Sequence, residues 1–357
     1  MVAALLGLIV LLIIGAETGL VEMMIGLVCA TLPVPIYLML LLWIDRFEGE
    51  PSWMLATAFF WGAIVAVFVA LILNTFNRVV VAAATHSMQI GENFGAVISA
   101  PLVEESAKAF IILLLFFFKK DEFDGIIDGI IYAGMVGLGF AMTENILYYG
   151  RAVQGGLATL TVVFVMRGMA SPFFHPLATS MTGIGFGWSR QSDNGFVKVT
   201  APVIGFMLAV LLHGLWNGFA TYGGVAAFFA AYFLIMGPAF IITLMVVAFS
   251  LRREGRIIRQ YLYPDFQRGF FDPQEYEGLC SVFGRMRLSW TAFNKGGFAE
   301  WRRRKRYHQL ASELAFHRSR VSRRIASISQ MTPEREQAYL ADLEQIRRAM
   351  VSLPRTR

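Results

Sequence analysis

The sequence predicts an all-α protein: a polytopic transmembrane helix bundle of about eight spans, followed by a cytoplasmic helical C-terminal tail. The first indication is composition, because the 357 residues are 56% hydrophobic and only 16% charged, whereas an ordinary soluble domain is about 25% charged. The second is pattern, because apolar residues form unbroken runs such as 110–118, whereas barrel strands alternate apolar and polar residues. These observations exclude a disordered protein and argue against a soluble enzyme and a β-barrel.

Eight apolar stretches reach or approach the roughly 20 residues that a helix needs to cross a bilayer. The first is short, and we interpret it as an uncleaved helix because it has no basic region before it and no small-residue cleavage site before Glu17. The stretch 157–170 is also apolar, but Arg167, Gly168 and Pro172 interrupt it, which favours a re-entrant or interfacial segment. The predicted spans are residues 2–16, 23–44, 53–73, 98–118, 125–149, 171–189, 199–221 and 225–249.

The charge balance changes sign after residue 250. Residues 1–250 carry 9 Lys and Arg against 14 Asp and Glu, whereas residues 251–357 carry 22 against 11. This change predicts a transmembrane domain over 1–250 and a basic helical tail over 251–357. Positive charge is enriched on the cytoplasmic side of membrane proteins, so we expect the tail and, with an even number of spans, both termini to be cytoplasmic.

The tail has the signals of a helical hairpin. Asp272-Pro273 and Thr332-Pro333 each resemble a helix start, and the stretch 301–330 between them is strongly basic with apolar residues at helical spacing. A basic helix next to a membrane favours anionic lipid headgroups as its partner over nucleic acid.

Several predicted spans contain polar side chains that are costly in lipid and usually mark a functional site. Glu104 lies 15 residues before Lys119, and His175 and His213 lie 15 residues from Arg190 and Lys198. At 1.5 Å per residue these positions are about 22–24 Å from the cytoplasmic end, which places them at one level in a core of about 30 Å. Glu144 lies at the same level. The complete set of candidate site residues is Glu104, Glu105, Lys108, Glu144, His175, His213 and Asn217.

This inventory is suited to metal-dependent hydrolysis. Two histidines and a carboxylate can hold Zn²⁺ and leave a position for water, and a second carboxylate can accept the proton of that water. Glu104 and Glu105 are adjacent and point about 100° apart on a helix, so we expect one to face the site and the other to pair with a cation such as Lys108. Asn217, one turn after His213, could be a weak ligand or could stabilise an oxyanion.

The motifs resemble those of the PrsW family of intramembrane metalloproteases, within the wider CAAX-endopeptidase-like and bacteriocin-processing group. Glu-Glu-x-x-Lys stands at Glu104–Lys108, Phe-Ala-x-x-Glu-Asn at Phe140–Asn145, and His-x-x-x-Asn at His213–Asn217. The resemblance covers roughly residues 45–250. The wider group usually has His where this chain has Glu144, so Glu144 is either a metal ligand or a neighbour of the ligands.

The resemblance implies an intramembrane metalloendopeptidase that uses a divalent metal, preferably Zn²⁺. Glu104 would be the general base, with Glu105, Lys108 and Asn217 assisting. His175 and His213, with Glu144, would hold the metal. The implied substrate is a membrane-embedded protein such as an anti-sigma factor, and the implied location is a plasma membrane.

Two other classes of function stay open. Intramembrane Glu, His and Lys also form the proton relays of transporters, although no internal repeat of the transporter type is present in the sequence. A metal-binding membrane scaffold without turnover would use the same ligands.

Overall fold

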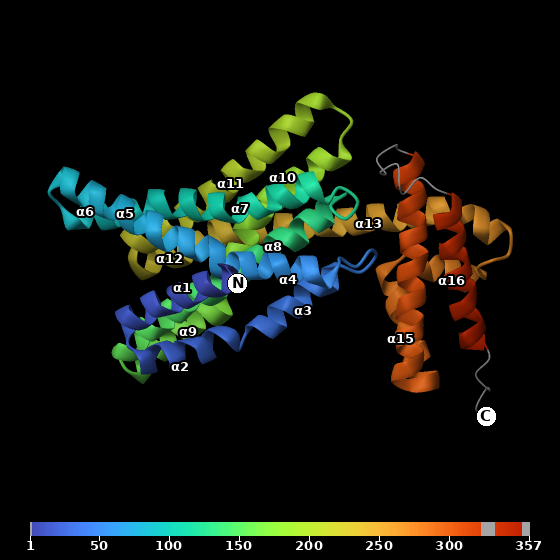
Figure 1. The fold of residues 1–357 in the computed structure, drawn as a ribbon, viewed down its shortest axis with the longest axis horizontal. Helices are drawn as coiled ribbons and strands as arrows, with labels where there is room; N and C mark the ends of the chain where they lie inside the picture. Colours follow the sequence, from blue (N-terminus) through green and yellow to red (C-terminus); the bar gives the residue numbers. More distant parts are fainter. Residues whose placement is uncertain (1, 323–332, 352–357) are drawn as a thin grey trace. The chain divides into compact units, whose positions relative to one another are not determined.

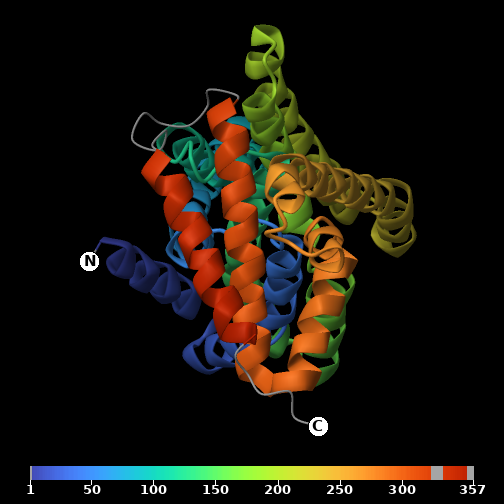
Figure 2. The same cartoon turned by 90° about the vertical axis from the view of Figure 1, so that its right-hand side faces the viewer.

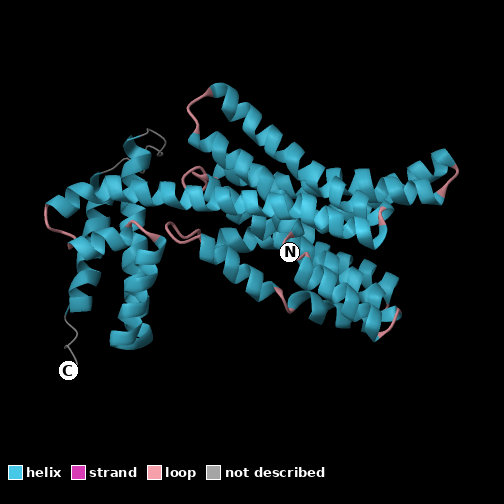
Figure 3. Cartoon of the chain, turned by 180° about the vertical axis from the view of Figure 1, so that it is seen from behind, coloured by secondary structure: helices cyan, strands magenta, loops and turns pink. Residues whose placement is uncertain are grey.

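The computed structural model describes residues 2–322 and 333–351. Within this part of the chain every regular element is a helix (Figure 3), which confirms the predicted all-α class. The chain divides into two compact units. The first unit comprises Met1–Ile44 and Glu50–Met245, and the second comprises Asp45–Gly49 and Val246–Arg357.

The first unit contains the apolar helices (Figure 1). Four of its elements are π-helices, named η, which carry one extra residue in a turn. In chain order the elements are α1 (Val2–Thr18), α2 (Leu20–Thr31), α3 (Val34–Ile44), α4 (Ser52–Phe60), η1 (Trp61–Ala66), α5 (Val67–Thr85), α6 (Met88–Phe94), η2 (Gly95–Ser99), α7 (Ala100–Phe118), α8 (Ile126–Gln154), α9 (Leu157–Phe164), η3 (Val165–Ala170), α10 (Phe174–Gln191), α11 (Gly195–Tyr222), α12 (Gly224–Ala231), η4 (Tyr232–Met236) and α13 (Gly237–Gln267).

Six helical segments of the described chain are long and apolar enough to cross a membrane, and the shorter α1 is apolar as well. The predicted span over 98–118 forms α7, but it is not among the six because it carries the charged residues Glu104, Glu105 and Lys108. The interrupted stretch 157–170 forms α9 and η3, which lead through a turn into α10. The six segments are Leu20–Ile44, Ser52–Thr85, Ile126–Gln154, Leu157–Gln191, Gly195–Tyr222 and Ala226–Gln267.

Helix α8 is the central helix of the first unit. In its most apolar window 83% of the residues are buried, and it contacts α2, α4, η1 and α10. Glycines allow these close approaches. A Cβ atom at Gly129 would meet the carbonyl of Gly183 on α10, and one at Gly137 would meet the backbone of His175. The small residues of α8 therefore bring the start of α10 against the middle of the bundle.

The second unit is formed by the end of α13 with α14 (Pro273–Leu279), α15 (Val282–Ser322) and α16 (Pro333–Val351). Asp272 caps α14, as predicted, by accepting a hydrogen bond of 2.8 Å from the backbone N–H of Glu275. Helix α15 changes direction at Gly296 and Gly297, and φ of Gly297 is +66°. Helices α15 and α16 lie side by side (Figure 2). The expected cap Thr332 and the end of the predicted helix over 301–330 lie outside the described residues.

The short segment Asp45–Gly49 packs within the second unit. Phe47 is buried, and the guanidinium of Arg285 lies 4.5 Å from its ring centroid. Arg320 donates to Glu48 over 2.8 Å. Many basic residues of this unit are likewise used in internal ion pairs, among them Arg304 with Glu275 and Arg318 with Asp265.

His308 on α15 is buried, and its Nε2 atom has no hydrogen-bond partner within the described chain. Burial and the positive charges of Arg285, Arg304 and Lys305 hold the pKa of this imidazole well below its ordinary value of 6.5. The folded state therefore takes up this proton at a lower pH than the unfolded state does. As the pH falls from the pKa of His308 in the unfolded state to its lower pKa in the folded state, the free energy of unfolding decreases.

We expect His308→Phe to weaken the acid sensitivity of the second unit. In the unmodified chain the free energy of opening α15 should fall by up to about 1.4 kcal/mol per pH unit below about pH 6.5. Hydrogen exchange of the α15 amides, corrected for intrinsic exchange rates, measures this slope. The slope should be smaller in His308→Phe and unchanged in the control His86→Gln, which alters an exposed histidine of the first unit. Equal slopes in all three proteins would contradict the assignment to His308.

Candidate functional site

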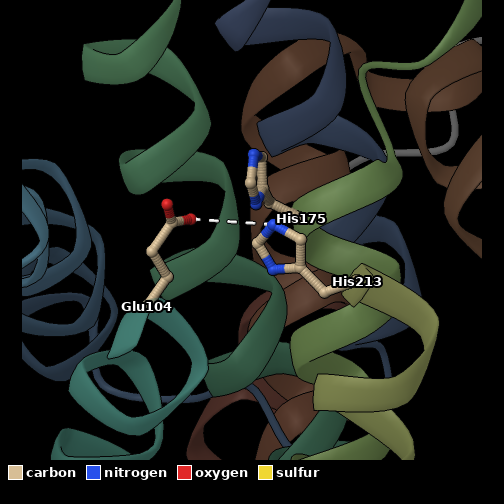
Figure 4. Close-up of side chains that lie close together, drawn as sticks. All are labelled: Glu104, His175 and His213. Atoms are coloured by element: carbon tan, nitrogen blue, oxygen red, sulfur yellow. Dashed lines mark ion pairs between the residues drawn. The ribbon is translucent and has the colours of Figure 1, made fainter. Parts of the chain in front are cut away.

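Four helices of the first unit bring six of the seven predicted site residues together. The geometry is clearest for Glu104, His175 and His213, whose side chains point toward one another (Figure 4). Potential ligand atoms of these three residues lie within 4.8 Å of one another, and all three side chains are buried. We call the six residues the polar cluster: Glu104, Glu105 and Lys108 from α7, Glu144 from α8, His175 from α10 and His213 from α11.

Glu105 is the most highly connected member of the polar cluster. It is completely buried, and its Oε1 accepts hydrogen bonds of 2.9 Å from Nζ of Lys108 and from Nδ1 of His213. Its Oε2 accepts a third bond, also 2.9 Å, from the hydroxyl of Thr179. With its proton on Nδ1, His213 directs the lone pair of Nε2 toward Glu104. Carboxylates orient histidine ligands in the same way in many metal sites.

Glu104 is different because half of its carboxylate lacks a hydrogen bond. Its Oε2 has no hydrogen-bond partner within the described chain, and it lies 3.6 Å from Nζ of Lys108 and 3.8 Å from Nε2 of His213. Its Oε1 accepts a long hydrogen bond of 3.4 Å from the side-chain amide of Asn74. An orphaned carboxylate oxygen in a buried site is costly unless a cation or a donor reaches it.

Polar groups lead from Glu104 toward a cavity of about 220 Å³. Asn74 lines this cavity together with Arg78 and Glu92, and its Oδ1 accepts a hydrogen bond of 2.8 Å from the hydroxyl of Ser99. We call this space the polar cavity. Asn74 could not be recognised from the sequence, because an uncharged amide in an apolar span gives a weak signal.

His175 is held from both sides of its ring. Its Nε2 lies 3.0 Å from Oε2 of Glu144, and its Nδ1 lies 3.0 Å from Nζ of Lys108. Glu144 also forms an ion pair with Arg167 of η3. Arg167 donates from Nε to Oδ1 of Asn145 over 2.6 Å. From the sequence, Arg167 interrupts an apolar stretch and favours an anchor at the outer membrane interface over a residue that lines the entrance. The structure places it next to the polar cluster.

Asn217 is the predicted site residue that the structure does not bring into the polar cluster. It lies one turn after His213 on α11, and its side-chain amide donates to the carbonyl of Ala96 in η2 over 2.9 Å. This contact links α11 to the π-helix that precedes α7.

Aromatic rings surround the two histidines. The ring of Phe174 lies 4.9 Å from that of His175 and 5.0 Å from that of His213, and the ring of Phe140 lies 5.1 Å from that of His175. Lys108 also packs over Phe140, with Nζ 3.9 Å from the ring centroid. Apolar walls of this kind exclude water and strengthen the electrostatic interactions inside the polar cluster.

The residues present fit a divalent cation. Two imidazoles and a carboxylate are a donor set that catalytic zinc sites use, and Oε2 of Glu104 lacks a hydrogen bond within the described chain. In their ionised forms, the three carboxylates of the polar cluster also exceed Lys108 and Arg167 by one negative charge. Buried charge that is not balanced is unfavourable, and a cation held by His175 and His213 beside Glu104 would supply the missing positive charge.

Known proteins with similar sequences are proteases. The chain is 31% identical over 156 residues to Protease PrsW of Oceanobacillus iheyensis, a match that covers 43% of this chain and 64% of that protein. It is 30% identical over 178 residues to Protease PrsW of Geobacillus kaustophilus, covering 48% and 69% of the two chains. With Protease PrsW of Bacillus subtilis it shares 28% identity over 178 residues, covering 50% and 74%.

No solved structure matches the chain. The family described as PrsW family intramembrane metalloprotease matches residues 50–245, which is more than half of the sequence and includes all seven predicted site residues. The protein, a multi-pass membrane protein, therefore belongs to the PrsW family of intramembrane metalloproteases.

Proposed function

We propose that this protein hydrolyses a peptide bond of a membrane-embedded protein with the help of a divalent metal ion, and that the ion is Zn²⁺. The observation that carries the proposal is the convergence of Glu104, His175 and His213, whose ligand atoms lie within 4.8 Å of one another in a buried site. Membership in the PrsW family supports the same reaction. The family does not favour the alternatives of an ion-coupled transporter or a non-catalytic scaffold.

The contacts of each residue in the polar cluster suit it to a different role. His175 and His213 would hold the ion, because Glu105 orients the ring of His213 and Glu144 orients that of His175. Nδ1 of His175 would give up its 3.0 Å contact with Nζ of Lys108 to bind the ion. When bound, the ion supplies Lewis-acid activation of water and of the scissile carbonyl. Oε2 of Glu104, which has no hydrogen-bond partner in the described chain, would accept a proton from the attacking water and pass it to the leaving amine.

Lys108 and Asn217 would have supporting roles. Lys108 contacts both acidic side chains of its own helix and the ring of His175, so its charge would hold the two carboxylates in place. Asn217 would fix η2 against α11 through its bond to Ala96.

The setting of the reaction is part of the proposal. The basic tail favours an orientation with both termini in the cytoplasm. The resemblance favours a plasma membrane as the location and an anti-sigma factor as one class of substrate. Anionic lipid headgroups rather than nucleic acid would contact the tail. Exposed aromatic side chains of α15 such as Trp290 and Phe298, next to basic residues such as Lys295 and Arg302, support an interfacial location.

We expect the purified protein to contain about one zinc ion per chain. His213→Ala should lose most of this metal because it removes a ligand, whereas His86→Ala should retain it because His86 lies outside the polar cluster. Elemental analysis of both variants beside the unmodified protein measures the metal content. Folded protein without metal, and without uptake of added zinc, would overturn the ligand assignment.

Replacing the proton acceptor should stop the reaction without unfolding the protein. We expect Glu104→Gln to reduce cleavage of a membrane-anchored reporter protein by about 10²–10⁴-fold, since the amide cannot accept the proton. The matched control Asp193→Asn, at an exposed carboxylate, should cleave normally. A Glu104→Gln variant with full activity would exclude Glu104 as the general base.

Removing the buried ammonium should destabilise the first unit. Lys108→Met leaves Glu105 without its 2.9 Å ion pair, and loss of one partner of a buried pair typically costs about 3–5 kcal/mol. Thermal unfolding in detergent micelles should show a large loss for Lys108→Met and little change for the exposed control Lys198→Met. Adding Glu105→Gln to Lys108→Met should recover part of the loss, and the absence of any recovery would contradict the pairing.

A further inference from the structure

An apolar cavity of about 180 Å³ lies next to the polar cluster. Its walls come from η3, α10, α11, η4 and the start of α13, and they include Met169, Phe174, Leu177, Trp216, Met236 and Phe240. We call it the apolar cavity. None of the described residues that line it is charged.

The polar groups in its wall are already satisfied. The hydroxyl of Tyr232 donates to the carbonyl of Ala170 over 2.9 Å, and the hydroxyl of Ser171 donates to the carbonyl of Met166 over 2.7 Å. Any occupant is therefore bound through apolar contact and shape.

One aromatic ring separates the apolar cavity from the two histidines. Phe174 lines the cavity, and its ring contacts both His175 and His213. The same ring stacks on Trp216, with a centroid distance of 5.2 Å and an interplanar angle of 23°. Successive Cα atoms of an extended chain are about 3.8 Å apart. A residue next to a peptide bond held at the histidines can therefore place its side chain in this cavity.

We propose that the apolar cavity binds one large apolar side chain of the substrate, such as leucine, methionine or phenylalanine, beside the bond that is cut. This inference rests on the proposed function for the bond, but the cavity itself is independent of it. A dry apolar cavity of about 150 Å³ is large enough to hold benzene, so a space of about 180 Å³ accepts a phenyl ring or a leucine side chain. The uncharged walls would exclude Lys, Arg, Asp and Glu.

A lipid chain is the competing occupant. The structure offers a roomier apolar groove of about 540 Å³ for such a chain, lined by residues of η1, α5 and α7 such as Trp61, Leu73 and Phe110. No member of the polar cluster lines that groove. The apolar cavity is smaller and shares a wall with the histidines, which favours a single side chain held next to the chemistry.

The walls also contain the structural irregularities that often mark functional sites. Two π-helices, η3 and η4, contribute Met169, Tyr232 and Met236 to the lining, and π-bulges occur frequently at functional positions. Gly237 follows η4 directly and lines the cavity as well. A Cβ atom there would meet only the carbonyl of Tyr232, at 3.4 Å, so a larger side chain at this position can fill the cavity without a severe clash.

Photocrosslinking tests the occupant directly. The full chain is placed in phosphatidylethanolamine and phosphatidylglycerol vesicles with a single-spanning leucine–alanine peptide that carries photo-leucine at one scanned central position. After irradiation, mass spectrometry should locate adducts on the cavity wall, at Met169, Met236 or Phe240, for one peptide position. Gly237→Leu should reduce these adducts at least about tenfold, since it fills the cavity. The control Phe233→Ala, an exposed position in η4 outside the lining, should leave them unchanged.

Equal adduct yields in the unmodified chain and in Gly237→Leu would overturn the proposal. It would also fail if a phospholipid with a diazirine in its acyl chain labelled the same wall residues and excess peptide did not compete.

Cleavage of the same peptides separates the cavity from the reaction. With glycine, alanine, leucine or phenylalanine at the position that crosslinks, kcat/KM should be about 10- to 100-fold higher for the two large side chains, and Gly237→Leu should remove this preference. Adducts on the wall without any cleavage would overturn the proposed function while supporting the binding site. Cleavage without a side-chain preference and without wall adducts would overturn the binding site alone.

Discussion

The buried carboxylate of Glu105 is the interaction on which the arrangement of the candidate site depends. A fully buried charge is stable only when its hydrogen-bonding capacity is used, and Glu105 accepts from Lys108, Thr179 and His213 at 2.9 Å each. These partners belong to α7, α10 and α11. One buried carboxylate thus links three helices and orients the ring of His213. Glu104 on the adjacent face of α7 keeps an oxygen without a hydrogen bond in the described chain.

Close packing around α8 makes this geometry possible. Lipid offers little hydrophobic driving force between helices, so membrane bundles depend on small residues that let backbones approach. Gly137 of α8 lies against the backbone of His175, and Gly129 lies against Gly183. The approach carries Glu144 to the ring of His175 and lets the guanidinium of Arg167 reach Glu144. Glycines that let the helix backbones touch therefore bring charged side chains of neighbouring helices within contact distance.

The sequence predicted the helical class, and it predicted that polar residues of different spans lie close together. Both predictions follow from regular helix geometry. Residues at equal distances from flanking charges lie at equal depth, and the structure indeed joins Glu104, Glu144, His175 and His213. The partners Asn74, Thr179 and Arg167 were not predicted, because a contact across helices depends on helix rotation. The π-helices have no distinct sequence signal, and the contact of Asn217 with Ala96 in η2 depends on one of them. The family comparison supplied the class of reaction, which geometry alone leaves open.

The candidate site has a polar cavity and an apolar cavity as neighbours. Glu104 contacts Asn74, which lines the polar cavity, whereas both histidines contact Phe174, which lines the apolar one. Hydrolysis inside a membrane must combine water with a chain segment that partitions into oil. On the proposed function, with water supplied from the polar cavity and a substrate side chain held in the apolar one, neither reactant has to cross the other's medium. The rate would then depend on two partition equilibria that lipid composition and water activity shift independently.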